Sequence, residues 1–426
     1  MKLRFEPVKR SPIFTSIPAV EWNSWSWQLR QSLKSKAEFE KIFKLAEDEE
    51  SAFLRAQATN LNPIFNIRST PYYASLCTDS IDDPLRKILM PSQAEFSMGA
   101  QAQLDPLGEL KNSPAPRLIH RYPDRVLFLV TDICSVYCRY CTRKHFTGQE
   151  QAFIKESEYE QALQYLRSRT GIREVILSGG DPLTLSDQHL QRVLSDLRSI
   201  EHIEIIRIGT RMPVVCPMRI TPDLVAMIRK FGPVYLMTHF NHPRELTAEA
   251  KMALDLFADA GIPLFNQMVL LRGVNNHPAI VQALSRRLLY LRVKPYYMFQ
   301  CDPSEGTDHL RTSLEESEKI QAELWGNLSG LAMPNFSIDV PSGGGKVGVV
   351  PDFEISRSAN GRSYLGFDGV REEYRNPENH ELKIPTDLNQ YLTEWEELKA
   401  AKQIQPSGPL EPRIFSDKFF DGLIGE

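Results

Sequence analysis

The chain has 426 residues, of which 42% are hydrophobic and 24% are charged, and its formal net charge is −4. This composition is ordinary for a soluble globular protein with one large α/β domain and extensions, or with two smaller domains. No dense basic run or membrane-length apolar run is present, so we expect neither a nucleic-acid nor a membrane partner. The N-terminus lacks the apolar core of a signal peptide, which favours a cytoplasmic protein.

Residues 1–110 predict a mostly helical N-terminal extension. An amphipathic stretch opens at Trp22, and apolar residues recur at helical spacing from Phe39 to Ala56. Residues 101–119 contain three prolines and predict a connecting arm that leads into the next part of the chain.

From Arg125 onward, short apolar runs alternate with helix-like stretches. The predicted strands are 125–132, 173–178, 203–209, 234–240, 263–271 and 291–299. The predicted helices are 156–168, 187–199, 221–231, 247–260, 278–290 and 312–328. Strand–helix alternation repeated six times predicts a parallel sheet with helices outside, closed as a partial (β/α)6 TIM-like barrel. The carboxyl-terminal ends of such strands carry the chemistry, so polar residues after each strand are candidates for one site.

Three cysteines, Cys134, Cys138 and Cys141, follow the first predicted strand at spacing C-x3-C-x2-C. Three thiolates on one loop can hold three irons of a 4Fe–4S cluster and leave the fourth iron open. A structural zinc loop or unrelated core cysteines are the alternatives, but no fourth ligand lies at a zinc-finger spacing. A c-type haem site would need histidine where Thr142 stands. Six cysteines in so long a chain do not indicate a disulfide framework.

Two glycine-rich segments are less specific. Ser178-Gly179-Gly180-Asp181 follows the second strand, where such glycines are commonly part of a turn, although they also let backbone approach a ligand. Pro341-Ser342-Gly343-Gly344-Gly345-Lys346 is not a phosphate-binding P-loop, because the required flanking positions are both valine. It is either a flexible turn with a solvated lysine or a loop that presents a lysine to pyridoxal 5′-phosphate (PLP).

The residues around the cysteines resemble a known family. The C-x3-C-x2-C loop after a strand resembles the radical S-adenosylmethionine (SAM) superfamily. His120-Arg121-Tyr122-Pro123-Asp124-Arg125 upstream and Thr142-Arg143 downstream resemble the lysine 2,3-aminomutase family within it, and the similarity runs from about Trp22 to about Tyr374. The resemblance implies a 4Fe–4S cluster, SAM and PLP as cofactors, and the same partial-barrel fold.

The resemblance also implies a role for each candidate residue. The cluster ligands are Cys134, Cys138 and Cys141, and the PLP attachment is Lys346. The SAM pocket is implied at Ser178, Gly179, Gly180, Asp181, His239 and Gln267. The phosphate side of PLP is implied at Arg121, Tyr122 and Arg125. The substrate contacts are implied at Arg143 for the α-carboxylate and at Asp302 and Asp339 for a side-chain ammonium.

The implied activity is an isomerase that moves the amino group of a free amino acid from C2 to C3, with L-lysine as the expected substrate and β-lysine as the product. Alternatives are another cationic amino acid such as arginine, or lysine destined for an elongation factor. The long N-terminal extension disfavours the elongation-factor version. A non-catalytic iron–sulfur or zinc-binding scaffold is the alternative from another class, but it gives no reason for Lys346, Asp302 and Asp339 to accompany the cluster.

We expect four segments: 1–110, a helical extension; 111–330, the barrel; 331–378, the PLP-lysine and substrate segment; and 379–426, a tail. Many family members carry cysteines in the tail for an interface zinc, but no cysteine follows Cys301 here, so we expect no structural zinc. The expected partners are a small amino-acid substrate, a flavodoxin- or ferredoxin-type electron donor and further copies of the chain in a homo-oligomer.

Overall fold

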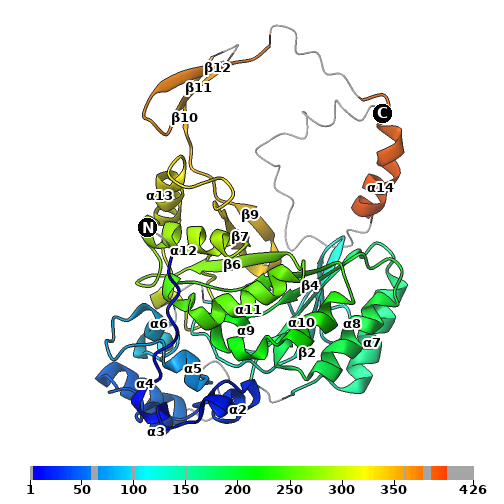
Figure 1. Cartoon of the computed structure of the whole chain (residues 1–426). Helices are drawn as coiled ribbons and strands as arrows, with labels where there is room; N and C mark the ends of the chain where they lie inside the picture. Colours follow the sequence, from blue (N-terminus) through cyan, green and yellow to red (C-terminus); the bar gives the residue numbers. More distant parts are fainter. Residues whose placement is uncertain are drawn as a thin grey trace.

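A computed structural model describes residues 3–58, 66–97, 99, 102–148, 151–358, 361–377 and 385–400. Within them, nine strands form one sheet in the order β1 to β9, and three more strands form a separate small sheet (Figure 1). No helix in these ranges is both long enough and apolar enough to cross a membrane.

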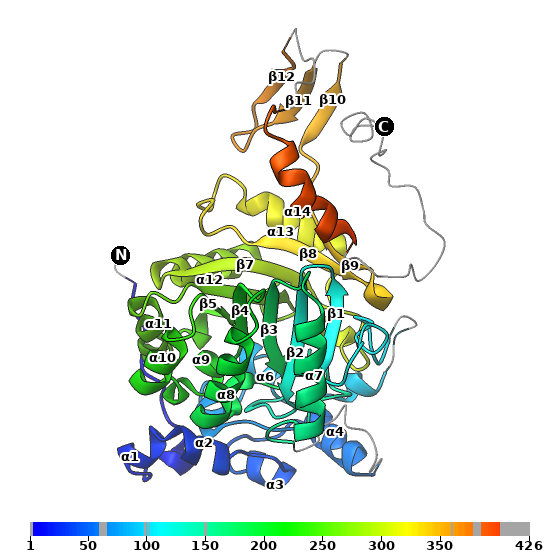
Figure 2. The same ribbon diagram turned by 90° about the vertical axis from the view of Figure 1, so that its right-hand side faces the viewer.

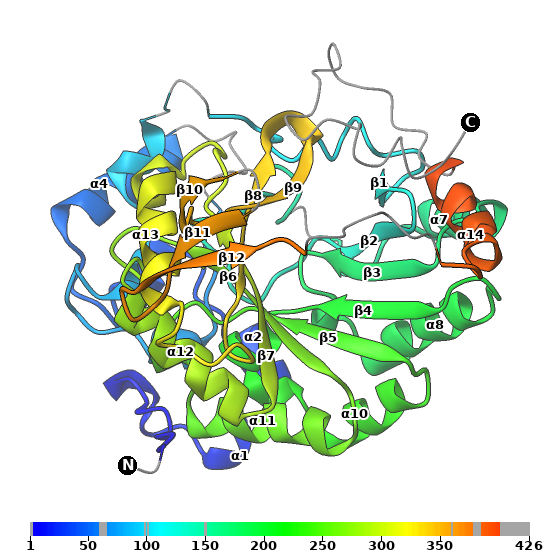
Figure 3. The same cartoon turned by 90° about the horizontal axis from the view of Figure 1, so that it is seen from above.

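The large sheet is a partial barrel with helices outside, as predicted. Its parallel strands are β2 (Arg125–Thr131), β3 (Glu174–Gly179), β4 (Ile205–Gly209), β5 (Val234–Thr238), β6 (Leu264–Leu270), β7 (Val293–Gln300) and β8 (Asn335–Val340). The helices between them are α7 (Glu156–Ser168), α8 (Asp187–Arg198), α10 (Pro222–Arg229), α11 (Ala248–Asp259), α12 (Pro278–Tyr290) and α13 (Leu314–Leu324). The view from above shows the strands converging with the helices around their outer side (Figure 3). The six predicted strands are confirmed, and β8 adds a seventh.

Helix α8 illustrates why these segments fold as they do. Its buried residues Leu190, Val193, Leu194 and Leu197 repeat at the spacing of one helical face and pack on the sheet. The hydroxyl of Ser186 accepts a hydrogen bond from the backbone N–H of His189 and caps the first turn. The sequence signals for cap and apolar face therefore agree, and the predicted helix differs from the observed one by one residue.

Both edges of the barrel sheet end in antiparallel hairpins that the periodicity did not predict. Strand β1 (Leu118–Tyr122) pairs with β2, and β9 (Gly345–Gly348) pairs with β8. The glycine-rich segment is therefore a hairpin turn rather than an open loop, and Lys346 lies on β9 directly opposite Asp339. One short 3-10 turn, Pro341–Gly343, joins the two strands, with Ser342 and Gly343 both at positive φ.

The N-terminal extension is helical and packs on the barrel, as predicted. Its helices are α1 (Ala19–Trp22), α2 (Trp25–Arg30), α3 (Lys36–Phe39), α4 (Glu47–Ala58), α5 (Pro71–Ala74) and α6 (Pro84–Lys87). The prediction of continuous helical spacing from Phe39 to Ala56 is wrong between α3 and α4. There the Lys44 carbonyl accepts a hydrogen bond from the Arg86 guanidinium at 2.8 Å, and tertiary contacts replace helical ones.

Helix α5 ties the extension to the mouth of the barrel. The Thr70 hydroxyl donates to the Val215 carbonyl at 2.6 Å, and the Tyr72 hydroxyl lies 2.6 Å from that of Thr247. Both tyrosines of α5 are fully buried. The extension therefore forms part of the wall near the ends of the barrel strands.

The C-terminal part forms an antiparallel sheet of β10 (Glu354–Arg357), β11 (Gly361–Leu365) and β12 (Arg371–Arg375), followed by α14 (Asn389–Ala400). Figure 2 shows this sheet apart from the barrel, beyond α13 and β9. Residues 379–384 and 401–426 of the predicted tail lie outside the described residues.

Candidate active site

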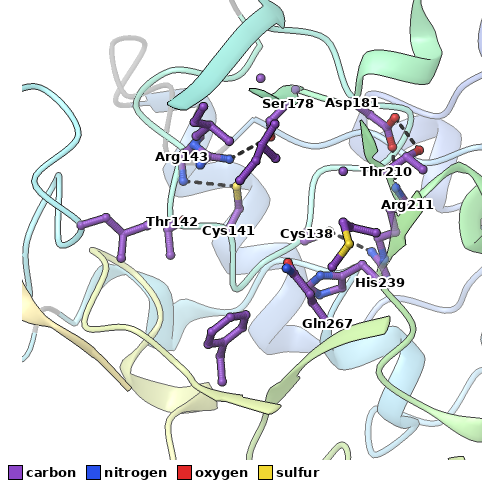
Figure 4. A pocket seen from close by; sticks show the side chains of 18 of the residues that line it. Cys138, Cys141, Thr142, Arg143, Ser178, Asp181, Thr210, Arg211, His239 and Gln267 are labelled. Atoms are coloured by element: carbon purple, nitrogen blue, oxygen red, sulfur yellow. Dashed lines mark hydrogen bonds between the residues drawn. The ribbon is translucent and has the colours of Figure 1, made fainter. Parts of the chain in front are cut away.

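All of the predicted site residues line one cavity of about 560 Å³ at the mouth of the barrel. Figure 4 shows part of it, with Cys138, Cys141, Arg143, Arg211 and His239 directed toward a common space. The cysteine loop enters from β2, the Ser178–Asp181 segment from β3, and Lys346 from β9. The topology thus brings residues from across more than 200 positions of the chain into one site.

The glycines after β3 have a packing reason that the sequence alone did not reveal. A Cβ on Gly179 would lie 2.0 Å from the Thr131 carbonyl oxygen, and one on Gly180 would lie 2.2 Å from that of Ile133. The Gly180 backbone N–H donates to the Thr131 carbonyl at 2.7 Å. These glycines let the end of β3 fit against the backbone that leads into the cysteine loop, which fixes where the loop begins.

The three cysteines form a sulfur-rich corner of the cavity. Burial raises the pKa of the Cys134 thiol well above its usual range, and the neighbouring Cys141 sulfur raises it further. Burial followed by the Cys138 charge also raises the pKa of Cys141. Three crowded thiolates are therefore costly on their own and need a compensating positive centre, which suits metal ligation by soft sulfur donors.

Three cysteine thiolates on one loop are a donor set that fits a 4Fe–4S cluster. Within the described ranges, no three His, Cys, Asp or Glu side chains converge on one ion position. A 4Fe–4S cluster instead takes one thiolate for each of three irons, so its ligands lie around a larger body.

Asp181 connects two strand ends within the cavity wall. Its carboxylate accepts hydrogen bonds from the Thr210 hydroxyl and the Arg211 backbone N–H, both at 2.7 Å, and from the Leu183 N–H at 3.0 Å. Burial raises the pKa of this carboxyl, and those hydrogen bonds oppose the increase. Asp181 therefore holds the end of β3 against the end of β4. Its carboxylate has a full set of protein partners, whereas the Ser178 hydroxyl does not.

His239 lies at the end of β5 beside Gln267 of β6. Its ring stacks on that of Tyr140, with centroids 5.6 Å apart and planes at 11°. Burial, and then the nearby Arg211 charge, lower the pKa of His239 to about 3. The imidazole is therefore neutral at physiological pH; its Nε2 lies 3.4 Å from the Asn241 side-chain nitrogen, which leaves Nδ1 to contact a bound molecule.

The hairpin of β8 and β9 builds a second corner of the cavity. The Asp339 carboxylate lies 3.3 Å from the Lys346 ammonium and 2.8 Å from the Arg121 guanidinium. The Lys346 backbone N–H donates to the Tyr122 hydroxyl at 3.0 Å, and its ammonium lies 5.2 Å from the centroid of the Phe299 ring. The lysine amine is thus held at the cavity wall between a carboxylate and an aromatic face.

Arginine side chains from β1 and β2 complete that corner. Arg125 stacks over the Tyr122 ring at 3.9 Å and pairs with Asp124 at 2.6 Å. With Arg121 from the preceding strand, two guanidinium groups face the region next to the Lys346 amine. A phosphate group bound in that region would meet planar cationic donors.

Asp302 lies just beyond β7, close enough to Asp339 for the two charges to interact. Burial raises the pKa of Asp302 to about 7, and the Asp339 charge is the next largest cause. Two carboxylates that lie close together in a shielded corner lose hydration and repel each other. They therefore favour binding of a cation, which neutralises their charge.

Arg143 is held by a residue that the sequence analysis missed. Its Nε–H donates to both Glu109 carboxylate oxygens, at 3.0 and 2.9 Å, and one terminal nitrogen donates to the same carboxylate at 2.6 Å. The other terminal nitrogen donates to the Ser178 hydroxyl at 3.2 Å. Glu109 lies in the connecting arm, where nothing in its spacing distinguishes it from a surface charge.

Comparisons with known proteins identify the family of this chain. The radical SAM superfamily model matches residues 128–282, and the lysine-2,3-aminomutase model matches residues 321–408. An L-lysine 2,3-aminomutase of Acetoanaerobium sticklandii is 43% identical over 89% of this chain and 91% of that protein. One from Fusobacterium nucleatum is 44% identical over 87% and 86%, and a glutamate 2,3-aminomutase of Clostridioides difficile is 38% identical over 80% and 79%. From this similarity along most of its length, the chain belongs to the lysine 2,3-aminomutase family of radical SAM enzymes.

Proposed function

We propose that this enzyme is an isomerase that converts free L-lysine to β-lysine by moving the amino group from C2 to C3. As a member of its family, the chain uses a 4Fe–4S cluster, SAM and PLP. When bound, these cofactors supply the radical chemistry, and the protein supplies orientation, charge and exclusion of water. The following roles are those of this chain's own residues.

The observation that carries the choice of lysine is the pair of carboxylates at one corner of the cavity. Asp302 and Asp339 lie near each other, and Asp339 already accepts an ammonium group, that of Lys346, at 3.3 Å. In the free protein Lys346 supplies that ammonium; once Lys346 attaches PLP, a substrate side-chain ammonium could take its place, whereas a side-chain carboxylate would add negative charge beside Asp302 and Asp339. The site therefore favours lysine over glutamate, the substrate in the name of one relative.

The remaining residues bind or orient the substrate and cofactors. Cys134, Cys138 and Cys141 would hold the cluster, and Ser178, His239 and Gln267 would border SAM. Arg143 would bind the substrate α-carboxylate through the terminal N–H groups that neither Glu109 nor Ser178 accepts. Arg121, Tyr122 and Arg125 would hold the PLP phosphate. A reduced flavodoxin- or ferredoxin-type protein would supply the electron.

Lys346 is the proposed attachment point of PLP. We expect borohydride reduction of the PLP-loaded protein to fix a pyridoxyl group on Lys346, detectable by peptide mapping, and we expect Lys346→Ala to lose that label. Lys111 is an exposed lysine beside the same hairpin turn, so Lys111→Ala is a matched control that should keep the label. Retention of a stoichiometric active-site label in Lys346→Ala would mean that PLP is attached elsewhere.

The proposed reaction is tested by incubating the anaerobically reconstituted, reduced enzyme with SAM and, separately, lysine, ornithine, arginine and glutamate. We expect β-lysine from lysine, and kcat/KM for lysine to exceed that for each other amino acid. Arginine is the strongest competitor, because its cationic head can also pair with two carboxylates. A preference for glutamate, or for arginine, would reject the proposed substrate.

A further inference from the structure

We propose that Arg211 is a positioning residue that raises the reduction potential of the iron–sulfur cluster by donating a hydrogen bond to the Cys138 sulfur. The proposal relies on the cluster ligands of the proposed function but not on its substrate. It gives a role to a residue that neither the motif nor the resemblance singled out.

The contact is direct and is drawn in Figure 4. One terminal nitrogen of Arg211 lies 2.8 Å from the Cys138 Sγ, and the other donates at 2.7 Å to both the Glu245 carboxylate and the Tyr73 hydroxyl. Only 9% of Arg211 is exposed. A guanidinium buried against a sulfur feels little screening by water, so its charge acts strongly on that sulfur.

Glu245 and its hydrogen-bond partners hold Arg211 in place. Glu245 is completely buried, and its second carboxylate oxygen accepts the backbone N–H groups of Asn241 and His242 at 2.6 and 3.0 Å. Its first oxygen accepts the Tyr73 hydroxyl at 2.8 Å as well as Arg211. Glu245 therefore cannot swing away without losing several hydrogen bonds, and the guanidinium is held in one orientation toward Cys138.

The arrangement also leaves one donor unused. The Arg211 Nε–H is buried and has no hydrogen-bond partner within the part of the chain that the structure describes. A buried arginine with an unfilled donor is costly, which argues against a purely structural role.

The sign of the effect follows from charge. Reduction adds one electron to the cluster and its thiolates, so a nearby positive charge and an N–H···S hydrogen bond stabilise the reduced state more than the oxidised one. Arg211 should therefore make the potential less negative and the cluster easier to reduce. Tyr73 comes from helix α5, so the N-terminal extension contributes to the electronic environment of the cluster.

The test is an EPR-monitored redox titration of the reconstituted protein without substrate. At a fixed potential, we expect Arg211→Gln to lower the ratio of reduced to oxidised cluster at least tenfold, which is about 59 mV for one electron. Arg207→Gln is the matched control. Arg207 lines the same cavity and pairs with Glu174, but it precedes Arg211 in the chain and lies up to about 13 Å from it along the strand direction. Its ratio should change less than threefold.

Two further variants separate the contact from general damage. Tyr73→Phe keeps the Arg211 charge and should change the ratio less than Arg211→Gln does. If Arg211→Gln takes up no cluster, Arg211→Lys decides: lysine keeps the charge but lacks the two terminal nitrogens that join Cys138 to Glu245, so the ratio should still fall at least threefold. An unchanged ratio in the loaded Arg211 variant, or an equal change in Arg207→Gln, overturns the proposal. Failure of the unaltered protein to take up a cluster would instead contradict the proposed function.

Discussion

Replacing Cys141 with alanine is expected to abolish reductive cleavage of SAM. One of the three thiolates would be lost, and the remaining two cannot hold three irons of a cluster. The expected readouts are a large loss of bound iron and sulfide after reconstitution, and loss of 5′-deoxyadenosine formation with dithionite and SAM. Cys134→Ala and Cys138→Ala should behave in the same way.

Cys77→Ala is the matched control for the cysteine variants. Cys77 is a free cysteine of the N-terminal extension that lies outside the cavity lining, so its loss should leave iron content and SAM cleavage near those of the unaltered protein. Full cluster content and cleavage in Cys141→Ala would show that this cysteine is not a ligand.

The sequence predicted the barrel well because its signals are local and agree with one another. Leu264 to Leu270 alternates buried and partly buried residues at the period of a strand, and helices α7 and α12 begin and end where predicted. Helices α7, α8 and α12 bury apolar side chains at helical spacing, and α8, α10, α11 and α13 each have a capping hydroxyl. The same strand order then brings the predicted site residues to one end of the sheet.

What the sequence did not predict depends on contacts between distant positions. Arg211 contacts Tyr73 across 138 positions, and Glu109 contacts Arg143 across 34. Each of these residues has an ordinary identity and no distinctive spacing, so only the folded chain reveals what it touches. The hairpin that pairs Lys346 with Asp339 was likewise missed, because its glycines weaken the usual strand pattern.

Replacing Asp302 with alanine is expected to reduce kcat/KM for lysine by about two to three orders of magnitude or more. Losing one partner of a largely desolvated ion pair costs about 3–5 kcal/mol, since the substrate ammonium would remain buried without full compensation. Asp339→Ala should have an effect at least as large, but it would also release Arg121 and Lys346, which Asp339 contacts directly. Asp302→Ala is therefore the cleaner test, with SAM binding and PLP content as the controls that should stay near normal.

The same carboxylate predicts a pH dependence. In the free protein, burial and the Asp339 charge raise the pKa of Asp302 to about 7. Below that pH the carboxyl is protonated and neutral, and above it the anion is available to bind an ammonium. Because kcat/KM reports the ionisation of the free enzyme, its value for lysine should fall as pH decreases through about 7. The pH profile of Asp302→Asn should lack this decrease at low pH, and its activity should be lower at every pH. If both proteins show the same decrease, or if Asp302→Ala turns over lysine as fast as the unaltered protein, this carboxylate does not bind the substrate ammonium.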